Sequence, residues 1–211
     1  MSPKKRSGQQ PRQRKRTASV FLNIPYDRKF ERLYLAYIAG ISAFGLVPRA
    51  TLEIPGGARR LDRIFSLIRE CQFSVHDLSR VQLDRNQPRT PRFNMPFELG
   101  LCVAWEKMGN QEHLWFVCES VQHRLAKSLS DISGTDAYIH DGTVAGIFRE
   151  LGNAFVRKEG RPSVQQIRMI YRILRVNLAK ILRQAGAASP FAARVFKDLC
   201  VLASAAADEV V

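Results

Sequence analysis

The chain carries FSVHDLS at residues 73–79 and NMPFELG at residues 94–100, and these two segments indicate how it folds. The first begins as a short apolar run and ends in polar side chains, which is typical of a buried strand. The second begins a helical pattern, because Asn94 is a good N-cap and Pro96 suits a first helical turn. Together they predict a strand and a helix joined by the polar loop 80–93.

The same alternation of strand and helix patterns extends to both sides of these segments. Further strands are expected at residues 19–24, 47–54, 113–118 and 137–139, and further helices at 28–44, 59–70, 143–157, 163–184 and 190–206. Strands that alternate with helices favour parallel pairing. The sequence therefore predicts an α/β fold, with a flavodoxin-like, mostly parallel five-stranded sheet, helices on both faces, and additional C-terminal helices.

Composition divides the chain into three parts. Residues 1–17 contain seven Lys and Arg, no acid and no hydrophobic residue after Met1, which predicts a disordered basic tail. An α/β domain is expected over residues 18–158 and a helical appendage over residues 159–211. The tail supplies half of the net charge of +14. Such a tail suits nucleic acid as a partner, and a solubilising role explains it equally well.

Other classes of protein are disfavoured by what the sequence lacks. It has no apolar run long enough to cross a bilayer, so we expect a cytoplasmic protein without a membrane partner. Its four cysteines are widely spaced and lie in apolar stretches, where buried, inert thiols are usual. Its four histidines follow no metal-binding pattern, so no metal site is expected.

The expected sheet also predicts where a ligand binds. Doubly wound sheets bind ligands beyond the carboxyl ends of their strands, where the strand order reverses. Polar segments fall there at residues 23–27, at 77–79 and at the helix start that holds Glu98. We expect Glu98 in the first helical turn, where the helix dipole favours an ionised carboxylate. Such a group can attack the anomeric carbon of an N-glycoside or stabilise its oxocarbenium-like charge, although helix capping is the commoner role.

A strand ending in Asp77-Leu78-Ser79, a polar loop and N-x-x-x-E-L-G at residues 94–100 together resemble a known superfamily. It comprises nucleoside 2-deoxyribosyltransferases and Toll/interleukin-1 receptor (TIR) domains. The segment VFLNIPYD at residues 20–27 is similar to the first strand and ligand-contacting loop of that superfamily. The resemblance covers about residues 19–140. The substrate loop of the transferases has no clear copy here, which favours hydrolysis or binding over transfer.

The resemblance implies that Glu98 is the catalytic carboxylate of an N-glycosidic bond hydrolase acting on a nucleotide or NAD. It implies that the sugar or base is bound by Asn23, Pro25, Tyr26, Asp27, Asp77, Ser79 and Asn94. Bacterial relatives often serve as antiviral-defence effectors, and TIR-like enzymes often work only when assembled. An effector role and a homo-oligomer are therefore implied too, and no cofactor is implied.

Phosphate binding is expected from the loop at residues 80–93. It carries four arginines and a single acid, and arginine side chains suit phosphates. We expect Arg89 and Arg92 to bind the phosphates of the ligand, with a solvated surface loop as the alternative.

Two functions other than hydrolysis remain open. The same fold could serve as a catalytically silent nucleotide-sensing or signalling module. The basic tail and the arginines of the helix at residues 163–184 could instead make a nucleic-acid-associated adaptor. Released base, ligand binding without turnover, and salt-dependent binding to nucleic acid distinguish the three.

Overall fold

Five parallel strands form one sheet in the order β2-β1-β3-β4-β5 in the computed structural model. The structure describes residues 17–53, 59–81, 87, 89–109, 113–132, 134–156 and 161–211. The strands are β1 (Ser19–Asn23), β2 (Val47–Arg49), β3 (Phe73–Asp77), β4 (Leu114–Glu119) and β5 (Tyr138–Ile139). This order is that of flavodoxin-like sheets, so the predicted fold is confirmed. The predicted disordered tail at residues 1–17 lies outside the described residues, apart from Thr17.

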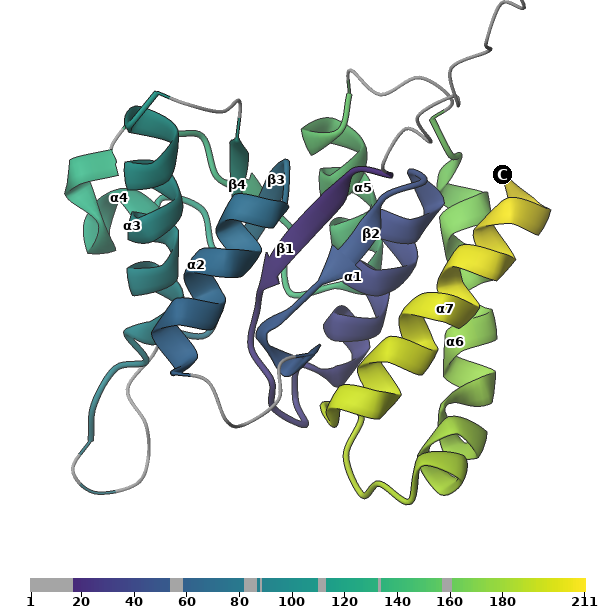
Figure 1. Cartoon of the computed structure of the whole chain (residues 1–211). Coiled ribbons are helices and arrows are strands. Elements are labelled where there is room, and N and C mark those ends of the chain that lie inside the picture. Colours follow the sequence, from purple (N-terminus) through teal and green to yellow (C-terminus); the bar gives the residue numbers. More distant parts are fainter. Residues whose placement is uncertain are drawn as a thin grey trace, which may run out of the picture.

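The helices form two layers on one face of the sheet and one layer on the other (Figure 1). Helices α2 and α3 cover one face, and α1 and α5 cover the opposite face. Helices α6 and α7 pack outside α1. The helices are α1 (Glu31–Ala43), α2 (Arg60–Glu70), α3 (Asn94–Lys107), α4 (Arg124–Ser128), α5 (Val144–Ala154), α6 (Val164–Ala185) and α7 (Ala193–Val210). The predicted C-terminal helices therefore share the core of the α/β domain.

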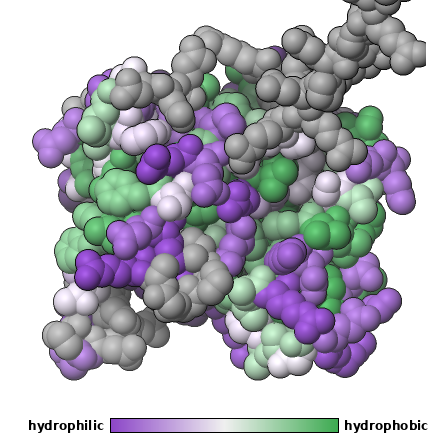
Figure 2. All heavy atoms as spheres, in the orientation of Figure 1, coloured by the Kyte–Doolittle hydropathy of each residue, from purple (hydrophilic) through white to green (hydrophobic). Residues whose placement is uncertain are grey.

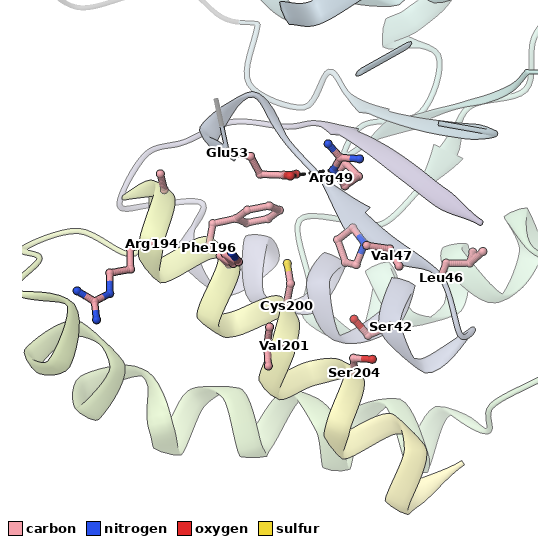
Figure 3. Close-up of a pocket in the computed structure, with 13 residues that line it drawn as sticks. Ser42, Leu46, Val47, Arg49, Glu53, Arg194, Phe196, Cys200, Val201 and Ser204 are labelled. Carbon is pink, nitrogen blue, oxygen red and sulfur yellow. Dashed lines mark hydrogen bonds and ion pairs between the residues drawn. The ribbon is translucent and has the colours of Figure 1, made fainter. Parts of the chain in front are cut away.

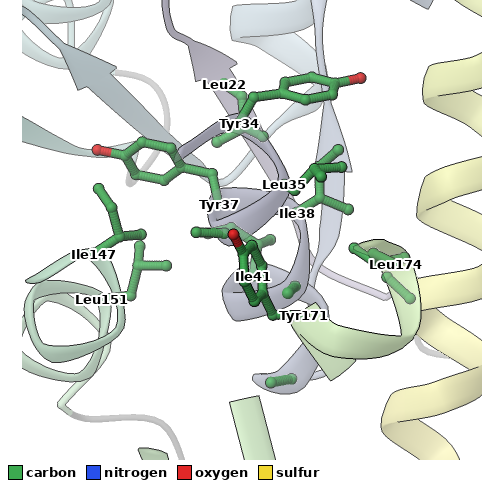
Figure 4. Packing of buried hydrophobic residues seen from close by; sticks show 14 of the residues in the cluster. Leu22, Tyr34, Leu35, Tyr37, Ile38, Ile41, Ile147, Leu151, Tyr171 and Leu174 are labelled. Carbon is green, nitrogen blue, oxygen red and sulfur yellow. The ribbon is translucent and has the colours of Figure 1, made fainter. Parts of the chain in front are cut away.

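Helix α1 is buried on almost all sides, which explains its composition. All eleven residues from Leu33 to Ala43 are buried, and a helix that is apolar all round belongs inside a protein. Its side chains meet β1 on one side and α5 and α6 on others (Figure 4). Two buried tyrosines satisfy their hydroxyl groups: Tyr34 donates to Pro190 O and Tyr37 donates to Asp77 Oδ2. The outer surface over α7 shows hydrophobic patches among hydrophilic residues (Figure 2).

Two local elements differ from the sequence prediction. The strand expected at residues 47–54 ends at Arg49, and the 3₁₀ helix Thr51–Glu53 follows it. The backbone turns after Arg49 because the Glu53 carboxylate accepts hydrogen bonds from Ala50 N and Arg49 Nε. Helix α4 was not expected, because its five residues carry too short a pattern to detect. No helix in the described part of the chain is long and apolar enough to cross a membrane.

Candidate functional site

A cavity of about 260 Å³ lies at the carboxyl end of β1, between the start of α2 and the start of α3. This is the edge of the sheet where doubly wound folds bind ligands. Its lining residues are Asn23, Ile24, Pro25, Tyr26, Thr51, Arg60, Arg92, Asn94, Met95 and Glu98. Six of the ten candidate site residues from the sequence are thus brought together: Asn23, Pro25, Tyr26, Arg92, Asn94 and Glu98.

Glu98 is the buried acid of this cavity. It is 4% exposed, and burial raises the pKa of its carboxyl group to about 7. Arg60 Nη2 lies 3.6 Å from Glu98 Oε1, and its positive charge opposes that shift. The carboxyl group is therefore about half ionised at neutral pH, which suits a group that binds and releases protons during a reaction.

The predicted cause of the ionisation state of Glu98 was wrong. Phe93 occupies the N-cap position of α3 without a side-chain hydrogen bond, so Asn94 does not cap the helix. Helix α3 begins at Asn94, which places Glu98 in its second turn, and the first turn carries no acid. The helix dipole acts mainly within the first turn. Desolvation therefore dominates at Glu98, and it favours the neutral form that the sequence argument did not expect.

A chain of buried hydrogen bonds runs from the cavity into the sheet. Asn23 and His76 are register partners on β1 and β3, and Asn23 Nδ2 lies 2.8 Å from His76 Nδ1. His76 Nε2 lies 2.9 Å from Ser74 Oγ, and Ser74 Oγ lies 2.9 Å from His113 Nε2. His113 Nδ1 ends the chain 2.9 Å from Cys71 O. All four side chains that take part in these hydrogen bonds are buried.

The acceptor at the end of this series of hydrogen bonds, Cys71 O, determines which atom donates in each of the others. Cys71 O can only accept, so His113 Nδ1 carries a hydrogen and His113 Nε2 accepts from Ser74. His76 Nε2 must then donate to Ser74 Oγ, and His76 Nδ1 accepts from Asn23 Nδ2. Burial lowers the pKa of His76 to about 3, in agreement with a neutral ring.

The same chain sets how Asn23 faces the cavity. Asn23 Nδ2 donates to Met95 O at 2.9 Å as well as to His76, so both of its amide hydrogens are used. Within the described part of the chain, no hydrogen bond is made by Asn23 Oδ1. The amide therefore offers an oriented acceptor at the cavity, which suits a ligand hydroxyl or N–H group.

Tyr26 and Asp27 hold the loop that follows β1. Tyr26 donates to Leu22 O at 3.1 Å, and its ring lies 6.0 Å from the Phe191 ring, between α6 and α7. Asp27 Oδ1 accepts hydrogen bonds from the backbone N–H groups of Lys29 and Phe30. Asp27 Oδ2 forms ion pairs with two arginines, at 2.9 Å from Arg80 Nε and 3.3 Å from Arg92 Nη1. Asp27 thus joins the first loop to the loop before α3.

Four of the ten candidates lie outside the lining of the cavity: Asp27, Asp77, Ser79 and Arg89. Asp77 is fully buried and faces α1, because adjacent strand residues point to opposite faces and His76 points toward α3. Ser79 N donates to Asp77 Oδ1 at 2.9 Å. Arg89 is exposed. Much of the predicted phosphate-binding loop, residues 82–86 and 88, lies outside the described residues. A binding role for these candidates stays a prediction.

Sequence reasoning missed two residues that line the cavity: Thr51, at the start of the 3₁₀ helix, and Arg60, the first residue of α2. One signal for Arg60 was present. Arg59 and Arg60 stand together at the start of a helix, where the helix dipole disfavours cations. An arginine pair at such a position indicates an anionic partner, and here Glu98 is one.

The described residues contain no group of three or more His, Cys, Asp or Glu side chains that could hold a metal ion. All four cysteines are free, and burial raises the pKa of the Cys102 thiol to about 12. The fold and the cavity define a doubly wound α/β protein with a buried acid at the carboxyl edge of its sheet, where such folds bind ligands. No family model and no curated protein matches the sequence. The function is therefore inferred from the cavity itself.

Proposed function

We propose that the protein hydrolyses the N-glycosidic bond of a nucleotide or NAD, with Glu98 as the catalytic carboxylate. The observation that carries the proposal is the buried Glu98 carboxyl group, with its pKa raised to about 7, in a cavity that also holds Arg60 and Arg92. Enzymes commonly raise the pKa of a glutamate to this range by burial when the group moves protons.

Each lining group has a place in this reaction. The ionised Glu98 carboxylate stabilises the positive charge that develops on the sugar ring as the bond from C1′ to the base nitrogen breaks. The electron pair of that bond leaves with the base. Water adds its hydroxyl group to C1′, and Glu98 takes up the remaining proton of that water. The proton then passes to the anionic base released from a nucleotide, or to solvent when neutral nicotinamide is released from NAD. Asn23 Oδ1 accepts a hydrogen bond from the ribose, which holds C1′ near the carboxylate.

The two arginines of the cavity favour a phosphorylated substrate. The side chains of Arg60 and Arg92 are 59% and 44% exposed, so each can turn from its present carboxylate partner toward a phosphate. The cavity of about 260 Å³ lies below the range of about 300–1,000 Å³ usual for small-molecule sites. It therefore suits the ribose and phosphate, with the base directed outward.

The test is incubation with a panel of nucleosides, nucleotides and NAD, followed by chromatography of released base. Glu98→Gln should abolish release, whereas Glu106→Gln, farther along α3 and outside the cavity, should retain it. Binding of a nucleotide without release of base by the wild-type protein would instead identify the silent sensing module. Release that persists in a folded Glu98→Gln protein would contradict the assignment of Glu98.

A nucleic-acid-associated adaptor is the second candidate, and helix α6 favours it. Arg168, Arg172, Arg175 and Arg183 are exposed, and their spacing places them along one side of the helix. Helix α6 contains no acidic residue. Binding to DNA or RNA that falls steeply with salt, and weakens further when Arg172 and Arg175 are changed to Glu, would support this candidate.

A further inference from the structure

A second and larger cavity, of about 620 Å³, lies between the outer edge of β2 and helix α7 (Figure 3). It shares no lining residue with the cavity around Glu98. Leu46, Val47 and Pro48 form its wall on the sheet side, and Phe196 and Val201 form its wall on α7. We call it the α7 groove. Most of its lining is therefore apolar, although it opens to the surface.

The edge strand beside the α7 groove is poorly suited to accept another strand. Strand β2 has three residues, and the middle one is Pro48, which has no backbone N–H to donate. Short edge strands that contain proline resist pairing with a second chain. The groove is therefore better suited to a small molecule than to an extended peptide.

Ser42 provides an unused polar group inside the groove. It lies in the last turn of α1, is 3% exposed, and lines the cavity. A helical serine often donates to a carbonyl of its own helix. Ser42 Oγ has no hydrogen-bond partner in the described part of the molecule. A buried hydroxyl group without a partner is unfavourable, so an oxygen of a bound molecule would satisfy it.

Cations predominate among the charged residues of the groove. Arg49 is paired with Glu53 Oε2 at 2.8 Å, which neutralises both groups. Arg194 and Lys197 on α7 form no ion pair with any residue that the structure describes. The lining thus contains three cations and one carboxylate, Glu53. This excess of positive charge beside apolar walls favours a ligand that is both apolar and anionic.

We propose that the α7 groove binds a small amphipathic carboxylate, with its acid group at Lys197 and a second oxygen atom at Ser42. Lys197 and Ser204 are seven residues apart on α7, which is about 10 Å along a helix. Figure 3 shows Ser42 beside Ser204 at the far end of the groove. The apolar body lies between these ends, against Phe196 and Val201. A medium-length chain with an oxygen at each end satisfies both ends of the groove.

Calorimetric titration with 10-hydroxydecanoate tests whether the groove is a site. Ser204 is exposed and lines the groove, so Ser204→Trp should block it without disturbing the core. Val176→Trp is the matched control, because Val176 is 80% exposed on α6 and lies outside the groove. Binding that Ser204→Trp abolishes and Val176→Trp retains supports the proposal. No binding up to about 1 mM, or equal binding by both variants, overturns it.

Comparison with decanoate tests the roles of the two ends. Lys197→Gln should weaken binding of both acids about tenfold, because a charge-assisted hydrogen bond to the carboxylate is lost. Ser42→Ala should remove the preference of the wild-type protein for 10-hydroxydecanoate over decanoate. It should also raise the melting temperature of the free protein, since it removes an unsatisfied buried group. Retention of the preference in Ser42→Ala would overturn the assignment of Ser42.

Cys200 provides an independent readout of occupancy. Its thiol lines the groove and is partly exposed, whereas Cys71, Cys102 and Cys118 are buried. Burial raises the pKa of the Cys200 thiol well above its ordinary value, so its reaction with iodoacetamide is slow and is followed over hours by mass spectrometry of the intact protein. Bound 10-hydroxydecanoate should slow this reaction further. Cys200→Ser should remove the reaction, which assigns the alkylation to this thiol. An unchanged rate at saturating acid would place the ligand outside the groove and overturn the proposal.

Discussion

Arg60 Nη2 lies 3.6 Å from Glu98 Oε1, and this exposed guanidinium partly offsets the burial of the carboxyl group. Burial raises the pKa of Glu98, and Arg60 lowers it, with burial the larger effect. The result is an acid with a pKa of about 7 at the carboxyl edge of the sheet. Mutation of Glu98 removes the ionisable group, and mutation of Arg60 removes only the effect of its positive charge, so the two can be tested separately.

Glu98→Gln should stabilise the protein at alkaline pH. The pKa of Glu98 is raised from 4.5 to about 7 in the folded protein, so ionisation favours the unfolded state. The free energy of unfolding of the wild-type protein therefore falls by about 3 kcal/mol as the pH rises from about 4.5 to about 7. The Glu98→Gln variant should not show this loss, because glutamine does not ionise. Chemical denaturation at pH 4.5 and pH 8 measures the difference.

The control for this stability experiment is Glu106→Gln, on the same helix and outside the cavity. It should show no such gain between the two pH values. Equal stabilities of Glu98→Gln and wild type at pH 8 would mean that the Glu98 carboxylate is not destabilising. Its raised pKa would then be contradicted.

Arg60→Ala should move the ionisation of Glu98 to higher pH. The guanidinium group favours the carboxylate form, so its loss raises the pKa of Glu98 further above 7. The carboxyl resonance of Glu98, followed by NMR during a pH titration, reports this shift directly. If the carboxylate is the active form, the pH at which N-glycosidase activity rises moves the same way.

Arg59→Ala is the matched control, since Arg59 adjoins Arg60 and does not line the cavity. It should leave the titration of Glu98 nearly unchanged. A titration that is equally unchanged in Arg60→Ala would show that the two side chains do not interact in solution.

Much of the fold could be predicted, because it depends on local patterns. Apolar runs and helical periodicity located the six longer helices and every strand except β2 to within a few residues, and they located the start of β2 but not its end. The packing of α6 and α7 against α1 was not predicted, although the sequence of α1 indicates that more than the sheet covers it. Residues 33–43 have no polar face, so something other than the sheet had to cover this helix. Helices α6 and α7 do so.

The candidate site was predictable in position but not in its electrostatics. Glu98 and Asn23 follow from the rule that ligands bind at the carboxyl edge of the sheet. The pKa of Glu98 depends on how deeply α3 buries it and on Arg60, which is distant in sequence. The inward direction of Asp77 also required the structure. Alternation shows that His76 and Asp77 face opposite ways, and only packing shows which of them faces α1.

His76 and His113 should be neutral and in opposite tautomers. The hydrogen-bond chain places the proton of His76 on Nε2 and that of His113 on Nδ1. Burial lowers the pKa of both rings, so both should be neutral at pH 7.5. Nitrogen NMR of the labelled imidazole rings distinguishes the tautomers. A protonated ring at that pH, or the same tautomer in both residues, would contradict the hydrogen-bond directions assigned from Asn23 to Cys71.

Gly100→Ala should stabilise the protein by up to about 1 kcal/mol, because alanine favours a helix over glycine. Gly100 lies in α3 next to Glu98, and a β-carbon there would meet no atom within 4 Å. Gly146→Ala gives the opposite expectation, since its β-carbon would overlap His140 O. Thermal denaturation compares the two. A lower stability of Gly100→Ala would show that a neighbour needs the space.

Asp77→Ala should destabilise the protein without weakening a ligand in the Glu98 cavity. Asp77 Oδ2 accepts a hydrogen bond from Tyr37 at 2.8 Å and lies 3.2 Å from His140 Nε2, and all three side chains are fully buried. Gly142 N donates to His140 Nδ1, so the hydrogen of a neutral His140 lies on Nε2, toward Asp77. Loss of the carboxylate leaves the Tyr37 hydroxyl group without its acceptor and removes the negative charge beside His140 Nε2.

The expected cost of this change is about 1–3 kcal/mol, the penalty for a buried donor that is left without an acceptor. Chemical denaturation measures it, and calorimetry with AMP measures binding at a temperature where the variant stays folded. Asn23→Ala is the comparison, because Asn23 lines the cavity and should weaken AMP binding. If Asp77→Ala weakens binding as much as Asn23→Ala while the fold is intact, Asp77 contacts the ligand as the family resemblance implies. Unchanged binding would assign Asp77 to the support of α1 against the sheet.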